Sequence, residues 1–276
     1  MTINCKGTLV DLTSPKVMGI LNLTPDSFYD GGKYKNEKAI LKQTEKMLGE
    51  GASFIDMGAY SSRPGAQHVP EEEEKQRLLP VLELVLRYFP DAFFSIDTFR
   101  STVAQECLER GAAMINDISA GNLDENMFDI VAHFQVPYIA MHLKGTPQSM
   151  QKESIYEDVI TDLLHYFSEK LQKGRAKKIN DIIIDPGFGF AKTLKQNYHL
   201  LHHLELFQTL KKPLLIGLSR KSMIYKMLKS SPTEALNGST ALHSIALWKG
   251  AHILRVHDVK EAMECIVLME TLKANA

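Results

Sequence analysis

Cysteine is scarce in this sequence and lacks the spacing that disulfide frameworks and structural zinc sites need. Only Cys5, Cys107 and Cys265 occur among the 276 residues, an odd count without a CxxC or CxxxC pair. That count argues against disulfides and fits a reducing compartment. We therefore expect buried or incidental thiols and a cytoplasmic protein.

Long hydrophobic runs and a surplus of one charge are missing as well. The longest apolar runs are too short to cross a bilayer, and residues 1–11 lack the apolar core of a signal peptide. The formal net charge is −1, so nothing predicts binding to a membrane or to nucleic acid. An anionic ligand would have to be held by local positive groups.

What the sequence does contain is a series of short apolar runs, each followed by a stretch with helical periodicity. The runs are rich in β-branched or aromatic residues and do not alternate, as expected of strands buried on both faces of a parallel sheet. They span residues 17–23, 54–57, 93–96, 113–115, 138–141, 182–184, 214–218 and 253–256. Eight such units predict one α/β domain over residues 1–276, a (β/α)8 TIM barrel. The alternative, an open doubly wound sheet, usually has a glycine-rich first turn, and no GxGxxG or Walker A motif is present.

Two of the helical stretches have distinct features. Pro70 and the acidic run 71–74 indicate a solvated helix start, because carboxylates favour the positive end of the helix dipole. Pro80 is expected to kink this helix or to shift its start. The apolar face of this helix is marked by Leu78, Leu82, Val85 and Leu86, and that of the last helix by Ala262, Cys265, Ile266, Met269 and Leu272.

Polar residues stand at the end of almost every apolar run. They are Asn22, Asp56, Asp97, Asn116, His142, Asp185, Ser219 and His257. In a barrel these positions converge on the C-terminal rim, where TIM-barrel active sites lie. A single one, such as Asp56, has the alternative role of a helix cap, but eight in one mouth are costly to desolvate unless a ligand pairs with them. The pattern therefore predicts a polar ligand at the rim.

Basic residues after the last two runs indicate an anion site. The segment Ser219-Arg-Lys-Ser222 opens a helix, and the loops after strands 7 and 8 commonly bind phosphate in this fold. Arg255 and His257 share a side of the eighth strand. We expect Lys221, Arg255 and His257 to contact the ligand, and Arg220 to be a surface ion-pairing residue.

Three further loops complete the expected mouth. Residues 19–32 combine glycines, a proline and aspartates, as in a flexible loop that covers the mouth as a lid. Ser61, Ser62 and Arg63 offer hydroxyl and guanidinium donors suited to a phosphate. In residues 185–190, glycines allow unusual backbone angles, and Phe190 either presents its ring at the mouth or lies in the core.

Taken in order, these motifs resemble the dihydropteroate synthase family. The resemblance rests on residues 22–28, 30–32, 62–66, 95–98, 115–117, 141–147, 185–190, 219–222 and 255–258, and so covers nearly the whole chain. It implies a TIM barrel, a homodimer and the joining of 6-hydroxymethyl-7,8-dihydropterin pyrophosphate to p-aminobenzoate, with loss of pyrophosphate, in folate biosynthesis. Mg²⁺ is the implied cofactor, and sulfonamides, which mimic p-aminobenzoate, are the implied inhibitors.

The resemblance also assigns roles to residues. The implied pterin-binding positions are Asp97, Asn116, Asp185, Lys221 and Arg255. The implied pyrophosphate environment is Asn22, Arg63, Arg255 and His257, with Asn22 as the magnesium ligand. The implied p-aminobenzoate pocket is Phe28, Ser62, Pro64, Phe190, Lys221 and Ser222. The expected catalytic residues are Asp97, Asp185, Lys221, Arg255 and His257, in a substitution where the carbon–oxygen bond breaks before the amine attacks.

Two positions depart from the family pattern, which usually reads Gly-Glu-Ser-Thr where this chain has Ala59-Tyr-Ser-Ser62. Ser62 keeps the hydroxyl but lacks a methyl group, which predicts altered p-aminobenzoate packing rather than lost activity. Tyr60 replaces a carboxylate, and the sequence alone offers no physical account of that change.

Three other interpretations are weaker. The corrinoid methyltransferases that bind methyltetrahydrofolate are a related barrel that also holds a pterin, but they would not need the two basic segments. A non-catalytic pterin-binding protein is opposed by the phosphate positions, which are all present. A zinc enzyme would use His199, His202 and His203, which lie in a polar helical stretch where only the i, i+3 and i, i+4 pairs share a face.

Overall fold

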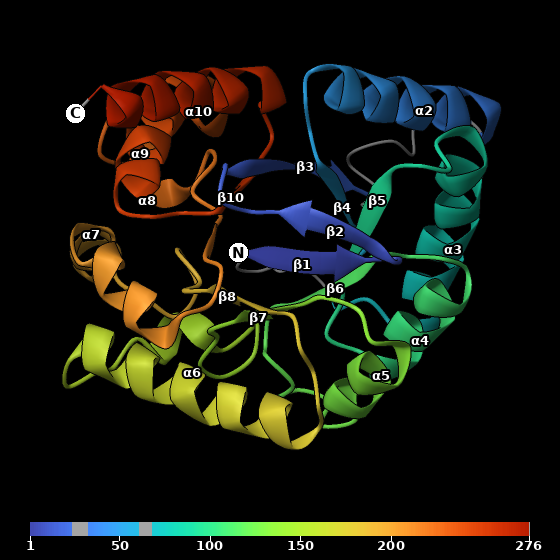
Figure 1. Ribbon diagram of the computed structural model, residues 1–276, viewed down its shortest axis with the longest axis horizontal. Coiled ribbons are helices and arrows are strands. Elements are labelled where there is room, and N and C mark those ends of the chain that lie inside the picture. The colour runs from blue at the N-terminus through green and yellow to red at the C-terminus, as the bar shows by residue number, and fades with distance from the viewer. Residues whose placement is uncertain (24–32, 61–67, 276) are drawn as a thin grey trace.

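Eight parallel strands form a closed barrel inside a ring of helices (Figure 1). The computed structural model describes residues 1–23, 33–60 and 68–275. Successive strands pair from β3 to β8, β10 pairs with both β3 and β9, and a parallel bridge between Ile184 and Leu214 links β8 to β9. The strands are β3 (Lys16–Asn22), β4 (Phe54–Gly58), β5 (Phe93–Asp97), β6 (Met114–Asp117), β7 (Tyr138–Met141), β8 (Ile182–Asp185), β9 (Leu215–Ile216) and β10 (Ile253–Val256). The expected TIM barrel is confirmed.

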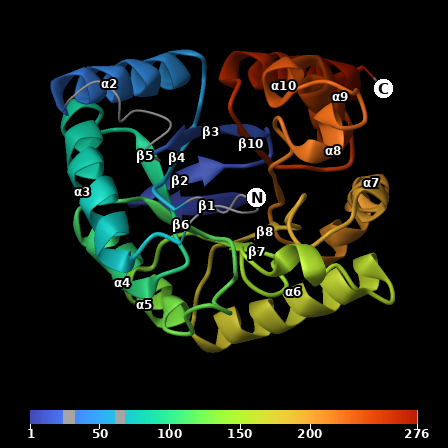
Figure 2. The ribbon, with the colours of Figure 1, turned by 180° about the vertical axis from the view of Figure 1, so that it is seen from behind.

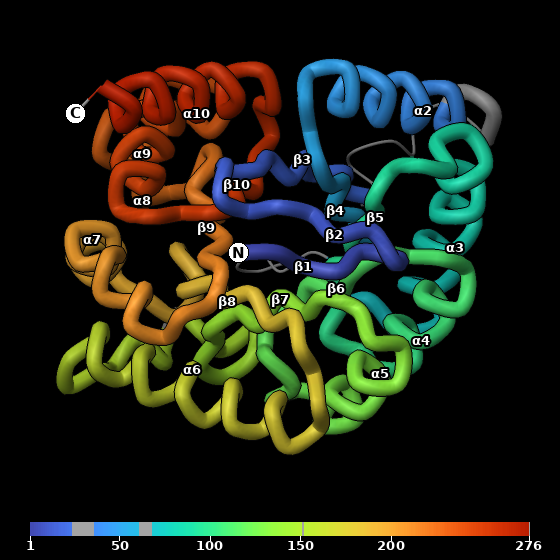
Figure 3. Tube along the Cα trace, viewed as in Figure 1, coloured from blue at the N-terminus to red at the C-terminus, as the bar shows by residue number. Residues whose placement is uncertain are grey.

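The helices follow the strands around the barrel, and the tube in Figure 3 circles once from α2 to α10. They are α2 (Lys33–Gly49), α3 (Glu71–Tyr88), α4 (Ser101–Glu109), α5 (Met127–Phe134), α6 (Val159–Ala176), α7 (Leu194–His202), α8 (Ser222–Tyr225), α9 (Leu236–Trp248) and α10 (Val259–Ala274). Short 3-10 helices span Met150–Lys152, Leu204–Leu210 and Pro232–Glu234. No helix in the described part of the chain is long and apolar enough to cross a bilayer.

Seven of the eight expected strands are present with ends shifted by no more than two residues. The seventh is a correction, because the run 214–218 forms only the two-residue strand β9. Its ladder with β10 covers Leu215 and Ile216 alone, and its contact with β8 is the single bridge at Leu214. The rest of the run is buried without extending the sheet.

An N-terminal hairpin, which the periodicity of the sequence did not indicate, closes one end of the barrel. Strands β1 (Thr2–Cys5) and β2 (Thr8–Asp11) pair antiparallel across a tight turn at Lys6 and Gly7, both with positive φ. Ile3 and Cys5 are fully buried against the N-terminal ends of the barrel strands. Figure 1 shows the hairpin lying across the centre of the barrel. Only the C-terminal end is left for a ligand.

The two helices with distinct features match their expectations in part. α3 begins at Glu71 and runs through Pro80, so this proline neither shifts its start nor ends it. The solvated helix start was wrong for Glu74, which is fully buried. In α10 the apolar face ends before Leu272, whose side chain is 54% exposed. The three cysteines are free and buried, as expected.

Candidate active site

The polar residues that follow the strands lie together at the C-terminal end of the barrel, away from the hairpin. Adjacent strands bring them level, since Asp97 is the register partner of Asn116, and Met141 that of Asp185. The buried members are Asp56, Asn116, His142, Asp185 and Ser219, and the half-buried ones are Asn22, Asp97 and His257. The expected convergence on this rim is therefore observed.

Arg255 joins two carboxylates at the centre of this mouth. Its Nε donates to Asp56 Oδ2 at 2.6 Å, and its Nη2 donates to Asp97 Oδ2 at 2.7 Å. Burial alone would lower the pKa of Arg255, but the two carboxylates raise it above its ordinary value. Burial raises the pKa of Asp97 to about 7, although Arg255 acts to lower it. One guanidinium thus links β10 to both β4 and β5.

Asp56 is the residue whose importance the sequence understated. It caps no helix: its Oδ2 also accepts a hydrogen bond from Asn116 Nδ2 at 2.9 Å. Because a carboxylate only accepts, Asn116 must turn its amide nitrogen toward Asp56. The Oδ1 oxygen is then the atom that Asn116 offers to a donor on a ligand. In the sequence Asp56 stands near the end of its apolar run, with Met57 after it, so nothing set it apart from the other polar residues expected at the rim.

Lys221 and residues 185–190 form another wall of the mouth. Lys221 Nζ donates to the carbonyl oxygen of Phe188 and lies 4.7 Å from the centroid of the Phe190 ring. Phe190 is therefore a half-buried ring at the mouth. Burial lowers the pKa of Lys221 to about 8, although Asp185 acts to raise it. Burial raises the pKa of Asp185, against the effect of Lys221.

The turn after β9 is tied to the end of β10. Arg220 pairs with Asp258 through Nε to Oδ2 at 2.9 Å and Nη2 to Oδ1 at 2.6 Å, so it is an ion-pairing residue as expected. His257 Nδ1 lies 3.0 Å from Ser219 Oγ, which also accepts from the His257 backbone at 3.1 Å. Helix α8 has only four residues. Side-chain charge, more than a helix dipole, must therefore attract an anion here.

Several of the expected site residues fall outside the described part of the chain. They are Phe28, Ser62, Arg63 and Pro64, together with most of the expected lid, residues 24–32. Within residues 1–23, 33–60 and 68–275, no three His, Cys, Asp or Glu side chains form a group that could hold a metal ion. The His203 ring lies 4.6 Å from those of His199 and His202, yet the three form no such group. Magnesium at Asn22 stays a prediction.

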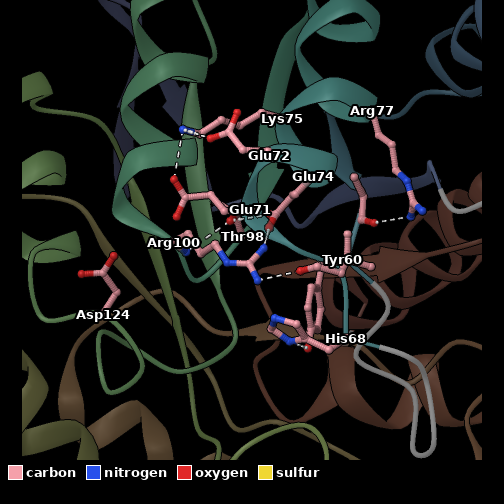
Figure 4. Close-up of polar contacts among 12 residues, drawn as sticks. Tyr60, His68, Glu71, Glu72, Glu74, Lys75, Arg77, Thr98, Arg100 and Asp124 are labelled. Carbon is pink, nitrogen blue, oxygen red and sulfur yellow. Dashed lines mark hydrogen bonds and ion pairs between the residues drawn. The ribbon is translucent and has the colours of Figure 1, made fainter.

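Tyr60 belongs to a buried polar network beside the mouth (Figure 4). Its ring lies edge-on to Phe99 at 5.0 Å and 5.4 Å from the guanidinium carbon of Arg100, and its hydroxyl accepts from Gln148 Nε2 at 2.7 Å. Arg100 also forms an ion pair with the buried Glu74. The charge of Arg100 is thus balanced by Glu74, and the Tyr60 ring contacts the guanidinium as an aromatic partner.

Comparison with known proteins gives consistent matches over the whole chain. Residues 18–257 match the family model described as a pterin binding enzyme. The dihydropteroate synthase of Escherichia coli (strain K12) is 43% identical, covering 99% of this chain and 98% of that protein. That of Haemophilus influenzae is 39% identical, with 100% of both chains covered. A solved structure of Yersinia pestis dihydropteroate synthase with a sulfonamide drug complex has a TM-score of 0.92 and 40% identity, covering 99% of this chain and 100% of that one.

Proposed function

Because the chain belongs to the dihydropteroate synthase family of pterin-binding enzymes, we propose that it condenses 6-hydroxymethyl-7,8-dihydropterin pyrophosphate with p-aminobenzoate to give 7,8-dihydropteroate and pyrophosphate. The observation that carries the proposal is the set of complementary groups at the mouth. Asp97, Asn116 and Asp185 offer oxygens to the amino and N–H donors of a pterin edge. Lys221 offers protons to the ring oxygen and nitrogen, and Arg255 a planar face for stacking.

The residues around the reacting carbon have electrostatic tasks in this proposal. The carboxylates of Asp97 and Asp185 favour the positive charge that develops on the pterin as the carbon–oxygen bond breaks before the amine attacks. Arg255 and His257, with Arg63, hold the departing pyrophosphate. No covalent bond to the protein is needed, because the nucleophile is the amine of p-aminobenzoate.

Magnesium fits the donor that the chain offers. Asn22 ends β3 with a half-buried side-chain amide, and an amide oxygen is a donor type that Mg²⁺ accepts. An ion that is bound mainly by pyrophosphate oxygens and water needs few protein ligands. When bound, it supplies positive charge to the leaving group.

The p-aminobenzoate site is proposed beside the pterin, where Phe190 and Lys221 already meet. Phe190, with Phe28 and Pro64, supplies apolar contact for the benzoate ring. Ser222 begins α8 next to Lys221, so a hydroxyl and an ammonium are both available to the carboxylate. The family resemblance assigns Ser62 to the same pocket.

A second copy of the chain is the proposed partner. Helices α9 and α10 lie side by side (Figure 2), and both carry large exposed hydrophobic side chains. They are Ile245, Trp248, Val267, Leu268 and Leu272. Several large exposed hydrophobic side chains on two packed helices are a feature of protein interfaces. Light scattering of the purified chain should give the mass of a homodimer, and the mass of a monomer would contradict this proposal.

The first test is pyrophosphate release from the pterin substrate with magnesium, with and without p-aminobenzoate. Release that depends on p-aminobenzoate and yields 7,8-dihydropteroate supports the proposal. Asp185→Asn should lower turnover and weaken pterin binding, whereas the exposed surface change Asp129→Asn should do neither. Pterin binding without release would favour a non-catalytic pterin-binding protein, and unchanged turnover in Asp185→Asn would remove that residue from the mechanism.

A further inference from the structure

Lys192 is a buried lysine behind the segment that carries Asp185 and Phe190. Its side chain is almost inaccessible, which is rare for lysine unless the ammonium is fully paired. Nζ lies 3.0 Å from the Gly187 carbonyl oxygen, 3.1 Å from that of Phe190 and 3.0 Å from His142 Nδ1. An ammonium has three protons, and here each has an acceptor.

The segment 186–191 contains no regular secondary structure, and apart from the bond from Phe190 N to the Gly187 carbonyl at 3.1 Å, side chains supply hydrogen bonds to its backbone. Tyr156 donates to the Ala191 carbonyl at 2.8 Å, and Asn197 Oδ1 accepts from Gly189 N at 2.6 Å. Gly187 has a φ of +72°, and a Cβ there would lie 2.3 Å from the His142 carbonyl oxygen. Lys192 is the side chain that holds two carbonyls of the segment at once. Without Lys192, the segment would lose both of these hydrogen bonds on the side that faces away from the mouth.

Lys192 also contributes charge to Asp185. Burial raises the pKa of Asp185, while Lys221, Arg255 and Lys192 each act to lower it. Lys221 and Arg255 lie at the mouth, where a ligand competes for them. The ammonium of Lys192 has its acceptors behind the segment and stays in place when the mouth is filled. Burial lowers its own pKa to about 7, with Asp185 opposing that shift and Lys221 adding to it.

We propose that Lys192 is a positioning residue: its hydrogen bonds to the Gly187 and Phe190 carbonyls fix segment 186–191 so that Asp185 and Phe190 face the mouth. The inference rests on the proposed function, since it concerns how that site is presented. It assigns no contact with substrate to Lys192. His142, which accepts from Lys192, is part of the same support.

Two substitutions separate the charge of Lys192 from its hydrogen bonds. Lys192→Met removes both, whereas Lys192→Gln keeps amide donors but no charge. In both variants the pKa of Asp185, followed by NMR of its carboxyl carbon, should rise, because a nearby positive charge is lost. The pKa of Asp97 is an internal control, because burial, Arg255 and Asp56 set it. The KM for p-aminobenzoate should rise about tenfold in Lys192→Met and less in Lys192→Gln, as expected for lost hydrogen bonds to a charged group.

Lys75 provides a matched control on α3. It too holds three acceptors, the carboxylates of Glu71, Glu72 and Glu106, but it is outside the mouth. Lys75→Met should leave both KM values and the pKa of Asp185 unchanged. Unchanged KM values and an unchanged Asp185 pKa in Lys192→Met and Lys192→Gln would overturn the inference. It would also be overturned if these variants only lost kcat and Lys75→Met lost kcat in the same way.

The outcome can be told apart from that of the proposed function. The NMR titration needs no substrate, so it tests Lys192 even if the wild-type chain makes no dihydropteroate. If Lys192→Met does not fold, the shift in Lys192→Gln decides the question. An unchanged Asp185 pKa in a folded Lys192→Gln, beside an active wild type, would overturn the role of the charge and leave the proposed function intact.

Discussion

The orientation of the side chains at the mouth depends on which hydrogen bonds each can donate or accept. Asp56 only accepts, and one of its oxygens takes hydrogen bonds from both Arg255 and Asn116. Those bonds decide which atoms the two partners offer to a ligand. Arg255 is anchored through Nε, and Asn116 is left to present its oxygen. A carboxylate inside the barrel thus sets the hydrogen-bonding pattern of two residues at its mouth.

Replacing Asp56 should therefore weaken pterin binding without removing any expected pterin-binding residue. Asp56→Ala leaves Asn116 free to turn and Arg255 held by Asp97 alone, so the Kd for the pterin substrate should rise at least about tenfold. Asp56→Asn keeps an oxygen acceptor and should lose less. Isothermal titration calorimetry measures both values, and wild-type affinity in Asp56→Ala would contradict the role given to Asp56.

The pH dependence of pterin recognition follows from two shifted residues. Asp97, with a pKa of about 7, must be ionised to accept, and Lys221, with a pKa of about 8, must be protonated to donate. Affinity should therefore fall below about pH 7 and again above about pH 8. The profile of kcat/KM for the pterin substrate measures this. Lys221→Arg, which stays charged, should abolish the alkaline fall, and a flat wild-type profile would refute the assignment.

At the scale of elements, a buried ion pair connects α3 to the start of α4. Glu74 of α3 is fully buried and accepts from Thr98 Oγ1 at 2.7 Å and from Arg100. Arg100 Nη2 also donates to the Val69 carbonyl at 2.7 Å. Both charges have partners. The pair therefore fixes α3 relative to the loop after β5 and to the loop before α3. Val69 and Arg100 stand just before α3 and α4, so the starts of both helices are held together here.

Breaking that pair should cost far more than breaking an exposed one. Arg100→Met leaves Glu74 buried and unpaired, so the free energy of unfolding should fall by about 3–5 kcal/mol. Arg110→Met, which removes a more exposed pair with Glu83, should cost about 0–1 kcal/mol. Without Arg100 the pKa of Glu74 in the folded state rises further, so the loss should shrink at acid pH. Urea unfolding of both variants measures these losses. Equal losses in the free energy of unfolding would contradict the difference expected between the buried and the exposed pair.

At the scale of the whole molecule, the two ends of the barrel have separate tasks. The hairpin β1–β2 closes the N-terminal end with apolar side chains, while the C-terminal end gathers charged and polar ones. A ligand can enter at only one of them. Stability and recognition are therefore expected to respond to different substitutions.

Ile3 tests this separation. Ile3→Ala opens a cavity among fully buried residues and should lower the free energy of unfolding by about 2–4 kcal/mol. KM values should stay unchanged, because the hairpin lies at the opposite end from the mouth. Leu9→Ala, in the same hairpin but 71% exposed, should change neither quantity. Thermal unfolding with steady-state kinetics checks both, and altered KM values in a folded Ile3→Ala would count against the separation.

The barrel and the place of its site could be predicted from the sequence. Strands buried on both faces leave continuous apolar runs, which local periodicity can show, and each run is followed by a residue such as Asp97 or Asp185 that points to the rim. The ion-pairing role of Arg220 could also be predicted, because a basic residue in a turn usually pairs with a carboxylate at the surface. The hairpin could not be predicted, since two strands of four residues each are too short to show a clear hydrophobic periodicity.

Which polar residues face the ligand and which support them depends on the folded arrangement of the chain. Arg255 meets Asp56 across 199 positions of sequence, and Lys192 meets His142 across 50. Such pairs depend on strand register and on which face of an element is turned inward, and neither leaves a trace in local composition. The same holds for Glu74, which has the sequence context of a solvated helix start but is buried because Arg100 reaches it from another element. Long-range geometry, not residue type, separates these supporting groups from ordinary surface charges.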